Sequence, residues 1–268
     1  MFRTYVFMLL IVILMGSSLC AKTSSSVISL APNITEIIYF LGVQDKLAGV
    51  TTACNFPLEA SRKEKVGEFG KVNVEKIVNL KPGLIITANF PDYLLAKLKP
   101  FKYQVLNYKM ETIDELLSSM EDMAKKLGGN VSKVEELRQR VKGQVARGKD
   151  RPKVLVLIWD KPLMAAGGKS FLNEIISLAG GENVFSKIPQ DYPKVTYEQI
   201  VAAKPDIVIF THKTSNLEKF KNYKIYTNIN PDILLRPGPR LITEGLEQLI
   251  RIIQTNQKPA TKVAVPKK

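Results

Sequence analysis

The sequence contains one histidine, one tryptophan and two cysteines in 268 residues. Two cysteines exclude a scaffold stapled by several disulfides and any cysteine-rich zinc module. One histidine excludes a metal centre built from several imidazoles. Beyond the N-terminal segment, no apolar run reaches the roughly 20 residues that a membrane-spanning helix needs. The remaining composition, 45% hydrophobic and 24% charged residues, is that of a globular protein.

Residues 1–21 have the pattern of a secretory signal peptide. A basic residue precedes the apolar run Tyr5–Met15, and small residues follow, ending at Ala21. This order of segments is typical of a leader that is removed on export. We expect a soluble exported protein. A lipid anchor on Cys20 is the alternative, although Leu19 stands where a lipoprotein signal has a small residue.

The net charge of +14 raises nucleic acid as a partner. Five of these charges lie in the signal peptide and in the tail 254–268, which we expect to be disordered because it is rich in lysine and proline. A groove that binds single-stranded nucleic acid requires aromatic residues among its basic ones. The densest basic run, Arg138–Lys153, contains none. We therefore expect no nucleic-acid partner.

An internal repeat organises the chain. Residues 73–88 have the sequence NVEKIVNLKPGLIITA, and residues 196–211 have the sequence TYEQIVAAKPDIVIFT. Each copy predicts an N-cap at Asn73 or Thr196, a short helix, a stop at Lys-Pro and a buried strand. The two copies share one acid, Glu75 in the first and Glu198 in the second.

A second pair of segments supports the duplication. Residues 34–42 (ITEIIYFLG) and 172–180 (LNEIISLAG) share a glutamate, two isoleucines and a final glycine. Asn33 and Glu36 have the spacing of a helix capping box. Alternating strands and helices in both halves predict an α/β protein of two lobes with mostly parallel sheets.

The sequence places the lobes at 22–111 and 151–253. Between them, residues 112–150 carry apolar side chains at helical spacing, which predicts one long connecting helix with a break or kink at Gly128-Gly129. Because a helical connector restrains hinge motion, we expect the lobes to move little relative to each other.

Signatures of catalysis are sparse. Gly167-Gly168-Lys169-Ser170 is similar to the end of a phosphate-binding loop, but Leu163 stands where that motif requires glycine. His212 is the sole candidate imidazole base, and we expect it in a surface loop after a strand. No nucleophile motif accompanies it. An exported hydrolase built on His212 therefore stays open only as a remote alternative.

Aromatic residues follow the predicted strands instead. Ligands of parallel α/β lobes bind beyond the carboxyl ends of the strands. The loops expected there, or just before the repeated helices, contain Phe69, Tyr93, Trp159 and Tyr192. Such a set suits a large, flat, partly apolar ligand.

The chain from Val27 to about Ile253 resembles the periplasmic substrate-binding proteins of ABC importers for cobalamin, haem and ferric siderophores. The resemblance rests on six motifs in order: VISLAPNITE, GVTTACNFP, VGEFGKVNVEKIVNLKPGLII, SFLNEIISLAGGENVF, YPKVTYEQIVAAKPDIVI and RPGPRLITEGLEQL. It implies two Rossmann-like lobes joined by one long backbone helix, a monomer without catalytic activity or cofactor, and docking of Glu75 and Glu198 onto a dimeric permease in the inner membrane.

For the ligand, the resemblance favours the cobalamin-binding members. It implies pocket aromatics at Phe69, Trp159 and Tyr192 and polar pocket residues at Asp232 and Arg236. A corrinoid is thus the expected ligand, held in the cleft between the lobes.

Two alternatives remain within the same transporter class, and one lies outside it. A haem carrier would use His212 with Tyr192 or Tyr93 on the iron. A ferric-siderophore carrier would want several pocket arginines, for which the sequence offers Arg236 and Arg240. An exported scaffold or sensor subunit with an empty cleft is the third alternative.

Overall fold

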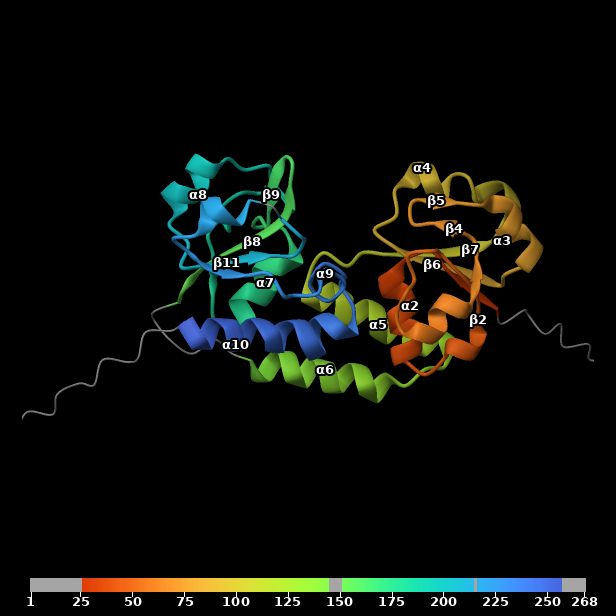
Figure 1. Cartoon of the computed structure of the whole chain (residues 1–268). Helices are drawn as coiled ribbons and strands as arrows, with labels where there is room; N and C mark the ends of the chain where they lie inside the picture. The colour runs from red at the N-terminus through yellow and green to blue at the C-terminus, as the bar shows by residue number, and fades with distance from the viewer. Residues whose placement is uncertain (1–25, 145–150, 215, 257–268) are drawn as a thin grey trace, which may run out of the picture.

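Two α/β lobes stand side by side on a shared base of helices in the computed structural model (Figure 1). The structure describes residues 26–144, 151–214 and 216–256. The predicted signal peptide with Cys20, and the predicted tail from residue 257 onward, lie outside the described residues.

The N-terminal lobe is built on a five-stranded sheet in which every pairing is parallel. In spatial order its strands are β3 (Glu64–Lys65), β2 (Leu47–Val50), β1 (Val27–Ser29), β6 (Leu84–Ala88) and β7 (Gln104–Tyr108). A small antiparallel hairpin, β4 (Gly67–Glu68) and β5 (Lys71–Val72), lies apart from this sheet. The helices of the lobe are α2 (Pro32–Phe40), α3 (Val74–Leu80) and α4 (Asp92–Leu95), with short turns η1 (Gln44–Lys46), η2 (Leu58–Arg62) and η3 (Lys99–Phe101).

The C-terminal lobe repeats this plan with a second five-stranded sheet, in which one strand is antiparallel. Its parallel strands are, in spatial order, β10 (Glu182–Asn183), β8 (Lys153–Asp160), β11 (Ile207–Phe210) and β12 (Lys224–Tyr226). β9 (Leu163–Ala165) folds back antiparallel on β8. The helical segments are α7 (Phe171–Leu178), α8 (Tyr197–Ala203), η4 (Leu217–Phe220), α9 (Pro231–Leu234), the π-helical turn η5 (Leu241–Gly245) and α10 (Leu246–Asn256). The predicted α/β architecture with two lobes and mostly parallel sheets is confirmed.

The repeated helices α3 and α8 begin and end alike. The side chains of Asn73 and Thr196 accept hydrogen bonds from the third backbone amide of each helix, at 3.0 and 3.3 Å. Lys81 and Lys204 then adopt the left-handed conformation, with φ of 46° and 50°, directly before a proline that cannot continue the helix. The caps predicted from the repeat are confirmed.

The connector differs from the single helix predicted over 112–150. It consists of α5 (Ile113–Leu127) and α6 (Val131–Gly143), and residues 145–150 lie outside the described part of the chain. Gly128 takes a φ of 68°, which ends α5, and the Asn130 side chain caps α6. The predicted break at Gly128-Gly129 thus divides the connector into two helices that pack together.

Two further predictions need correction. The prediction of a capping box at Asn33 and Glu36 is wrong. Helix α2 begins at Pro32, its N-cap is Ala31, and no side chain caps it. Pro32 provides a preset first residue, so Asn33 and Glu36 lie inside the helix and contact the other lobe. The predicted tail begins too early, because α10 continues through residues 254–256.

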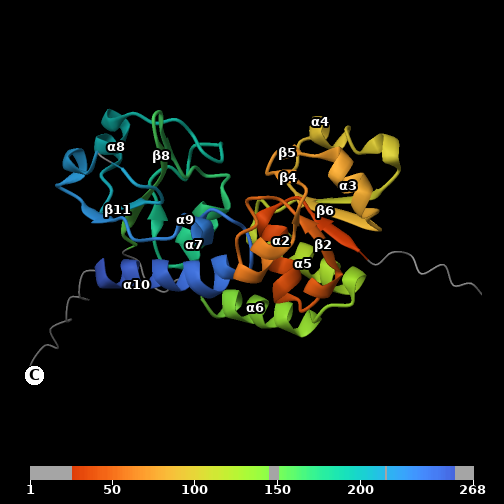
Figure 2. The ribbon, with the colours of Figure 1, turned by 45° about the vertical axis from the view of Figure 1, so that its right-hand side comes forward.

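A single apolar core runs along the base of both lobes. Fully buried side chains from α2 and α5 of the first half belong to the same cluster as side chains from α7 and α10 of the second half. Helices α6 and α10 lie along this base in both views (Figures 1 and 2), joined by an ion pair between Arg140 and Glu247. Each lobe also has a second, separate cluster around its own sheet.

The glycines that resembled a phosphate-binding loop serve close backbone packing. A Cβ on Gly168 would lie 2.0 Å from the carbonyl oxygen of Ser186, and one on Gly167 would lie 2.2 Å from that of Gln190. The backbone amides of both glycines also donate to this neighbouring segment, to Asp191 and Ile188. These two positions therefore require glycine for packing.

The Gly168→Ala variant tests this packing. Because the added methyl group meets a backbone carbonyl, we expect the free energy of unfolding to fall by about 1–3 kcal/mol, measured by urea denaturation. Gly143→Ala is the matched control, since a Cβ there meets no atom within 4 Å. Equal stability of the two variants would contradict the close-packing account.

Candidate functional site

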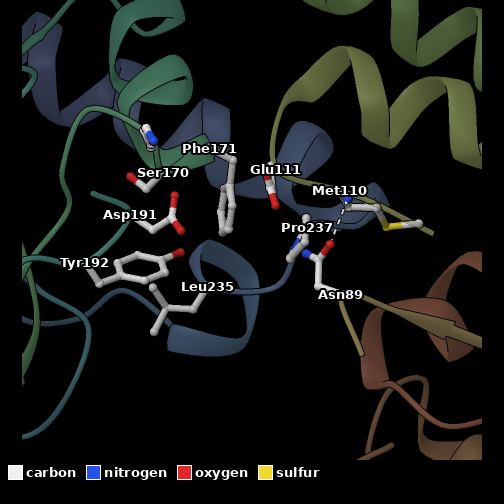
Figure 3. A pocket seen from close by; sticks show the side chains of 10 residues that line it. Asn89, Met110, Glu111, Ser170, Phe171, Asp191, Tyr192, Leu235 and Pro237 are labelled. Carbon is white, nitrogen blue, oxygen red and sulfur yellow. Dashed lines mark hydrogen bonds between the residues drawn. The ribbon is translucent and has the colours of Figure 1, made fainter. Parts of the chain in front are cut away.

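A cavity of about 290 Å³ lies between the two lobes, where residues from both contribute to its wall. Figure 3 shows side chains of the C-terminal lobe on one side and of the N-terminal lobe on the other, with the Phe171 ring between them. The lining residues are Asn89, Met110, Glu111, Lys169, Ser170, Phe171, Asp191, Tyr192, Leu235 and Pro237. It lies beyond the carboxyl ends of the parallel strands β6 and β7, where parallel α/β lobes bind ligands.

The cavity wall carries two carboxylates, those of Asp191 and Glu111, and one ammonium group, that of Lys169. Asp191 and Glu111 approach it from opposite lobes (Figure 3). Glu111 is paired with Lys109 at 2.9 Å, and no ion pair involves Asp191 within the described ranges. Burial, followed by the neighbouring Asp191, raises the pKa of the Tyr192 phenol. Tyr192 therefore presents a neutral hydroxyl and an aromatic face to a ligand.

Asp232 and Arg236 meet in a polar cluster between the lobes. They form an ion pair of 2.8 Å, and both bond to the Asn55 side chain of the N-terminal lobe. The Arg236 guanidinium donates to Asn55 Oδ1 at 2.7 Å, while Asn55 Nδ2 donates to Asp232 at 3.1 Å. The charge of Arg236 is therefore balanced within the protein.

Behind this cluster lies a buried carboxylate, Glu36 of α2. Its Oε1 is 3.7 Å from Arg236 and 3.9 Å from Arg240, and only 3% of the side chain is exposed. Burial raises the pKa of Glu36 to about 7, an effect that the two arginines reduce. Arg240 also stacks on the Phe56 ring at 3.9 Å, beside a second cavity of about 300 Å³.

The remaining predicted aromatics are exposed and do not line the cavity. Phe69 sits at the tip of the β4–β5 hairpin, with its ring 6.4 Å from that of Phe90, and Tyr93 lies in α4. Trp159 lies near the end of β8, opposite β9, and is 57% exposed. In Figure 1, the β8–β9 region lies on the side of its lobe that faces the lobe of the hairpin β4–β5.

His212 is engaged inside its own lobe. Its Nε2 is 2.7 Å from Asp160 Oδ1, and its ring packs against Trp159 and Phe210. Both ring nitrogens are buried. As placed, His212 does not offer a nitrogen to a metal in the cleft. It follows β11 as the sequence predicted, but the predicted surface position is wrong, because only 14% of its side chain is exposed.

The two duplicated acids, Glu75 and Glu198, are exposed in the first turns of α3 and α8. Hydrogen bonds from the backbone at its own position and from Thr196 lower the pKa of Glu198. Both helices lie away from the base formed by α6 and α10 (Figures 1 and 2).

Of the predicted site residues, the structure brings only Tyr192 to the cavity wall, while Asp232 and Arg236 meet beside Asn55. Met110 and Glu111 were missed because the strand before them, β7, was not predicted. The apolar Val105 and Leu106 within that strand were the available signal. Phe171 and Asp191 were also missed. Phe171 lies within the motif SFLNEIISLAGGENVF, and Asp191 directly precedes the predicted pocket residue Tyr192.

Metal and membrane signals are absent from the described chain. Residues 26–144, 151–214 and 216–256 contain no group of three or more His, Cys, Asp and Glu side chains able to hold a metal ion. Among the same residues, no helix is long and apolar enough to cross a membrane.

The fold and the cavity define a two-lobed ligand-binding protein. A family model described as periplasmic binding protein matches residues 27–230, and the chain belongs to this family. The predicted family resemblance is confirmed.

Individual relatives agree with this assignment. The chain is 31% identical over 264 residues to the vitamin B12-binding protein of Vibrio cholerae, covering 90% of this chain and 94% of that one. It is 29% identical to an uncharacterized ABC transporter substrate-binding lipoprotein, YvrC, of Bacillus subtilis, covering 87% and 81%.

Solved structures show the same architecture. The periplasmic vitamin B12-binding protein BtuF of Vibrio cholerae superposes with a TM-score of 0.76 at 27% identity, covering 88% of this chain and 98% of that one. A periplasmic haem-binding protein, RhuT of Roseiflexus sp. RS-1, shares the fold with a TM-score of 0.72 at 21% identity, covering 87% and 99%.

The buried Glu36 makes stability depend on pH. Its folded pKa of about 7 exceeds the ordinary value of 4.5, so ionisation costs more in the folded chain than in the unfolded one. Its contribution to stability is complete below pH 4.5 and is lost as the pH rises through 7. Relative to Glu36→Gln, we expect the wild type to lose about 1–3 kcal/mol of unfolding free energy over this range.

Urea denaturation at several pH values measures this difference. The exposed Glu135→Gln change serves as the control and should leave the pH profile of the wild type intact. A wild-type profile parallel to that of Glu36→Gln would show that Glu36 does not titrate in this window.

Proposed function

We propose that this protein is the exported substrate-binding component of an ABC importer. It captures a corrinoid, such as cobalamin, in the cleft between its lobes and passes it to a membrane permease. The protein performs no chemistry on this ligand. The observation that carries the proposal is the interlobe cavity, with a carboxylate from each lobe in its wall, in a member of the periplasmic binding protein family.

The charge of the cavity favours an amide-edged ligand. The periphery of a corrin ring carries neutral amide groups, which donate hydrogen bonds, whereas haem carries two propionates and catecholate siderophore complexes are anionic. Glu111 and Asp191 are acceptors for amide N–H groups and repel carboxylates. Glu111 is paired with Lys109, and Arg236 is paired with Asp232. Among the described lining residues, Asp191 is therefore the carboxylate and Lys169 the cation without an ion pair.

Haem fits these residues less well. An iron ligand would have to come from His212, Tyr93 or Tyr192. The nitrogens of His212 are buried against Asp160, and the raised pKa of Tyr192 opposes the phenolate that iron prefers. The name of the Vibrio cholerae relative, a vitamin B12-binding protein, favours the same choice.

Residue roles follow from this proposal. Tyr192 and Phe171, in the cavity wall, contact one face of the corrin ring. The exposed Phe69, Tyr93 and Trp159 supply aromatic surface to the parts of the ligand outside the enclosed cavity. Asp232 and Arg236 are polar contacts at its edge. We assign no metal ligand to His212.

Ligand titration tests this proposal. The fluorescence of Trp159, the only tryptophan, should be quenched by cyanocobalamin at lower concentration than by haem or a ferric catecholate siderophore. Asp191→Lys should weaken cyanocobalamin binding about tenfold, a loss of about 1.4 kcal/mol, because an amide acceptor is replaced by a cation.

Calorimetry with the same ligands keeps the result independent of the position of Trp159. The exposed Glu182→Lys change, in the same lobe, is the matched control and should bind as the wild type does. Tighter binding of haem than of cyanocobalamin would overturn the corrinoid assignment, and binding of none of the three ligands would overturn the transport function.

Docking onto the permease is proposed to use Glu75 and Glu198. They occupy equivalent positions of the duplicated unit, one on each lobe, as a dimeric permease with two equivalent sites requires. Both carboxylates are exposed and free of ion pairs to other described residues. The protein is proposed to act as a monomer, with a lipid anchor on Cys20 as the alternative to a soluble form. The lipoprotein relative supports that alternative.

Charge reversal separates docking from capture. Glu75→Lys with Glu198→Lys should reduce ligand uptake by a reconstituted importer to the level without binding protein, while calorimetry shows unchanged affinity. Reversal of the exposed Glu59 and Glu218 is the control. Normal uptake by the doubly reversed protein would rule out these two residues as the docking contacts.

A further inference from the structure

Trp159 and His212 lie side by side at the carboxyl ends of two neighbouring strands. Strands β8 and β11 are parallel, and their register pairs Leu157 with Phe210. A hydrogen bond of 3.0 Å from the Thr211 amide to the Leu157 carbonyl continues this pairing. Two residues beyond the last pair, the same register brings Trp159 next to His212. Because residues two positions apart on a strand share a face of the sheet, both side chains extend the face of Leu157 and Phe210.

A column of rings leads from this face into the core of the C-terminal lobe. The rings of Phe220 and Phe210 lie edge to face, with their centroids 5.2 Å apart. Phe210 meets His212 edge to face at 5.9 Å, and His212 meets Trp159 at 6.2 Å with an angle of 39° between the rings. All three distances lie in the range of favourable ring contacts, about 4.5–7 Å. The imidazole of His212 thus connects the indole of Trp159 to the core.

Exposure to solvent rises along this column. Phe210 is fully buried, the His212 side chain is 14% exposed, and Trp159 is 57% exposed. An exposed side chain without a fixed neighbour changes rotamer within picoseconds to nanoseconds. The contact with His212 therefore holds the indole in one orientation.

An imidazole suits this boundary because it combines an apolar ring with a polar edge. The ring packs against Phe210 and Trp159, while Nε2 lies 2.7 Å from Oδ1 of Asp160. Asp160 directly follows Trp159 on β8, and its side chain is 17% exposed. The carboxylate thus keeps the polar edge of the imidazole at the rim of the core.

We infer that His212 is the positioning residue for Trp159, and that it fixes the indole before a ligand arrives. His212 acts through Trp159 and does not itself touch the ligand. The β8–β9 region lies on the side of its lobe that faces the other lobe (Figure 1). Ordering a side chain on binding costs affinity, so an indole that is already fixed binds more tightly. The effect on affinity rests on the proposed function, whereas the immobility of Trp159 in the free protein does not.

Time-resolved fluorescence anisotropy tests the inference on the free protein, because Trp159 is the only tryptophan. For the wild type we expect a decay governed by tumbling of the whole molecule, with a small fast component. His212→Ala should increase the amplitude of the fast component at least about twofold. Tyr226→Ala is the matched control, since it removes a half-buried ring from the same sheet outside this column. It should leave the decay unchanged.

Two further variants separate the ring of His212 from its polar edge. His212→Phe together with Asp160→Asn restores a ring and leaves no unpaired carboxylate beside it, so the decay should return to that of the wild type. His212→Gln keeps a polar group near Asp160 without a ring, so it should behave as His212→Ala does. If His212→Ala does not fold, as judged by circular dichroism, these two variants decide.

A double-mutant cycle extends the test to the ligand. Calorimetry with cyanocobalamin should show about three- to tenfold weaker binding for His212→Ala. In a Trp159→Ala background, the same change should alter the affinity less than about twofold, because a positioning residue acts through its partner. A purely structural role of His212 would lower the affinity by the same factor in both backgrounds.

Three results would overturn the inference. They are an unchanged anisotropy decay in both His212→Ala and His212→Gln, a fast component in the ring-restoring variant as large as in His212→Ala, and an equal loss of affinity in the two backgrounds. Failure of the wild type to bind cyanocobalamin would count against the proposed function instead. The anisotropy would then still decide whether His212 holds Trp159.

Discussion

One continuous apolar core beneath both lobes constrains the rest of this structure. Side chains of α2 and α5 pack in the same cluster as those of α7 and α10, so the lobes cannot separate without exposing apolar surface to water. A flexible linker would impose no such cost. The cleft above this core therefore has a width set by packing, and the cavity wall is assembled before a ligand arrives, which reduces the ordering cost of binding.

The charges of the cleft are arranged on this rigid base. The arginines nearest to it are paired internally, Arg236 with Asp232 and Arg240 with Glu244. The lining itself keeps carboxylates from each lobe. Carboxylates in the cavity wall of a protein of net charge +14 show that overall charge says little about the ligand, because the positive charge is spread along the chain.

Local signals in the sequence were enough to predict where the repeated helices begin and end, because the caps at Asn73 and Thr196 depend on neighbouring residues alone. The site depended on contacts that sequence spacing does not contain. Glu36 has the spacing of a capping residue, yet it faces Arg236, 200 positions away, because Pro32 starts the helix earlier. Strand β7 has exposed and half-buried residues but no fully buried one, so its apolar pattern was weak, and the cavity residues that follow it were missed with it.

The central claim is that the cleft selects a corrin ring by its amide edge. Isothermal calorimetry with dicyanocobinamide, which carries amides around the ring, and dicyanocobyrinic acid, which carries carboxylates there, tests it directly because the two ring systems are the same. The account predicts at least tenfold tighter binding of the amide form, a difference of about 1.4 kcal/mol. Equal affinities, or tighter binding of the carboxylate form, would contradict it.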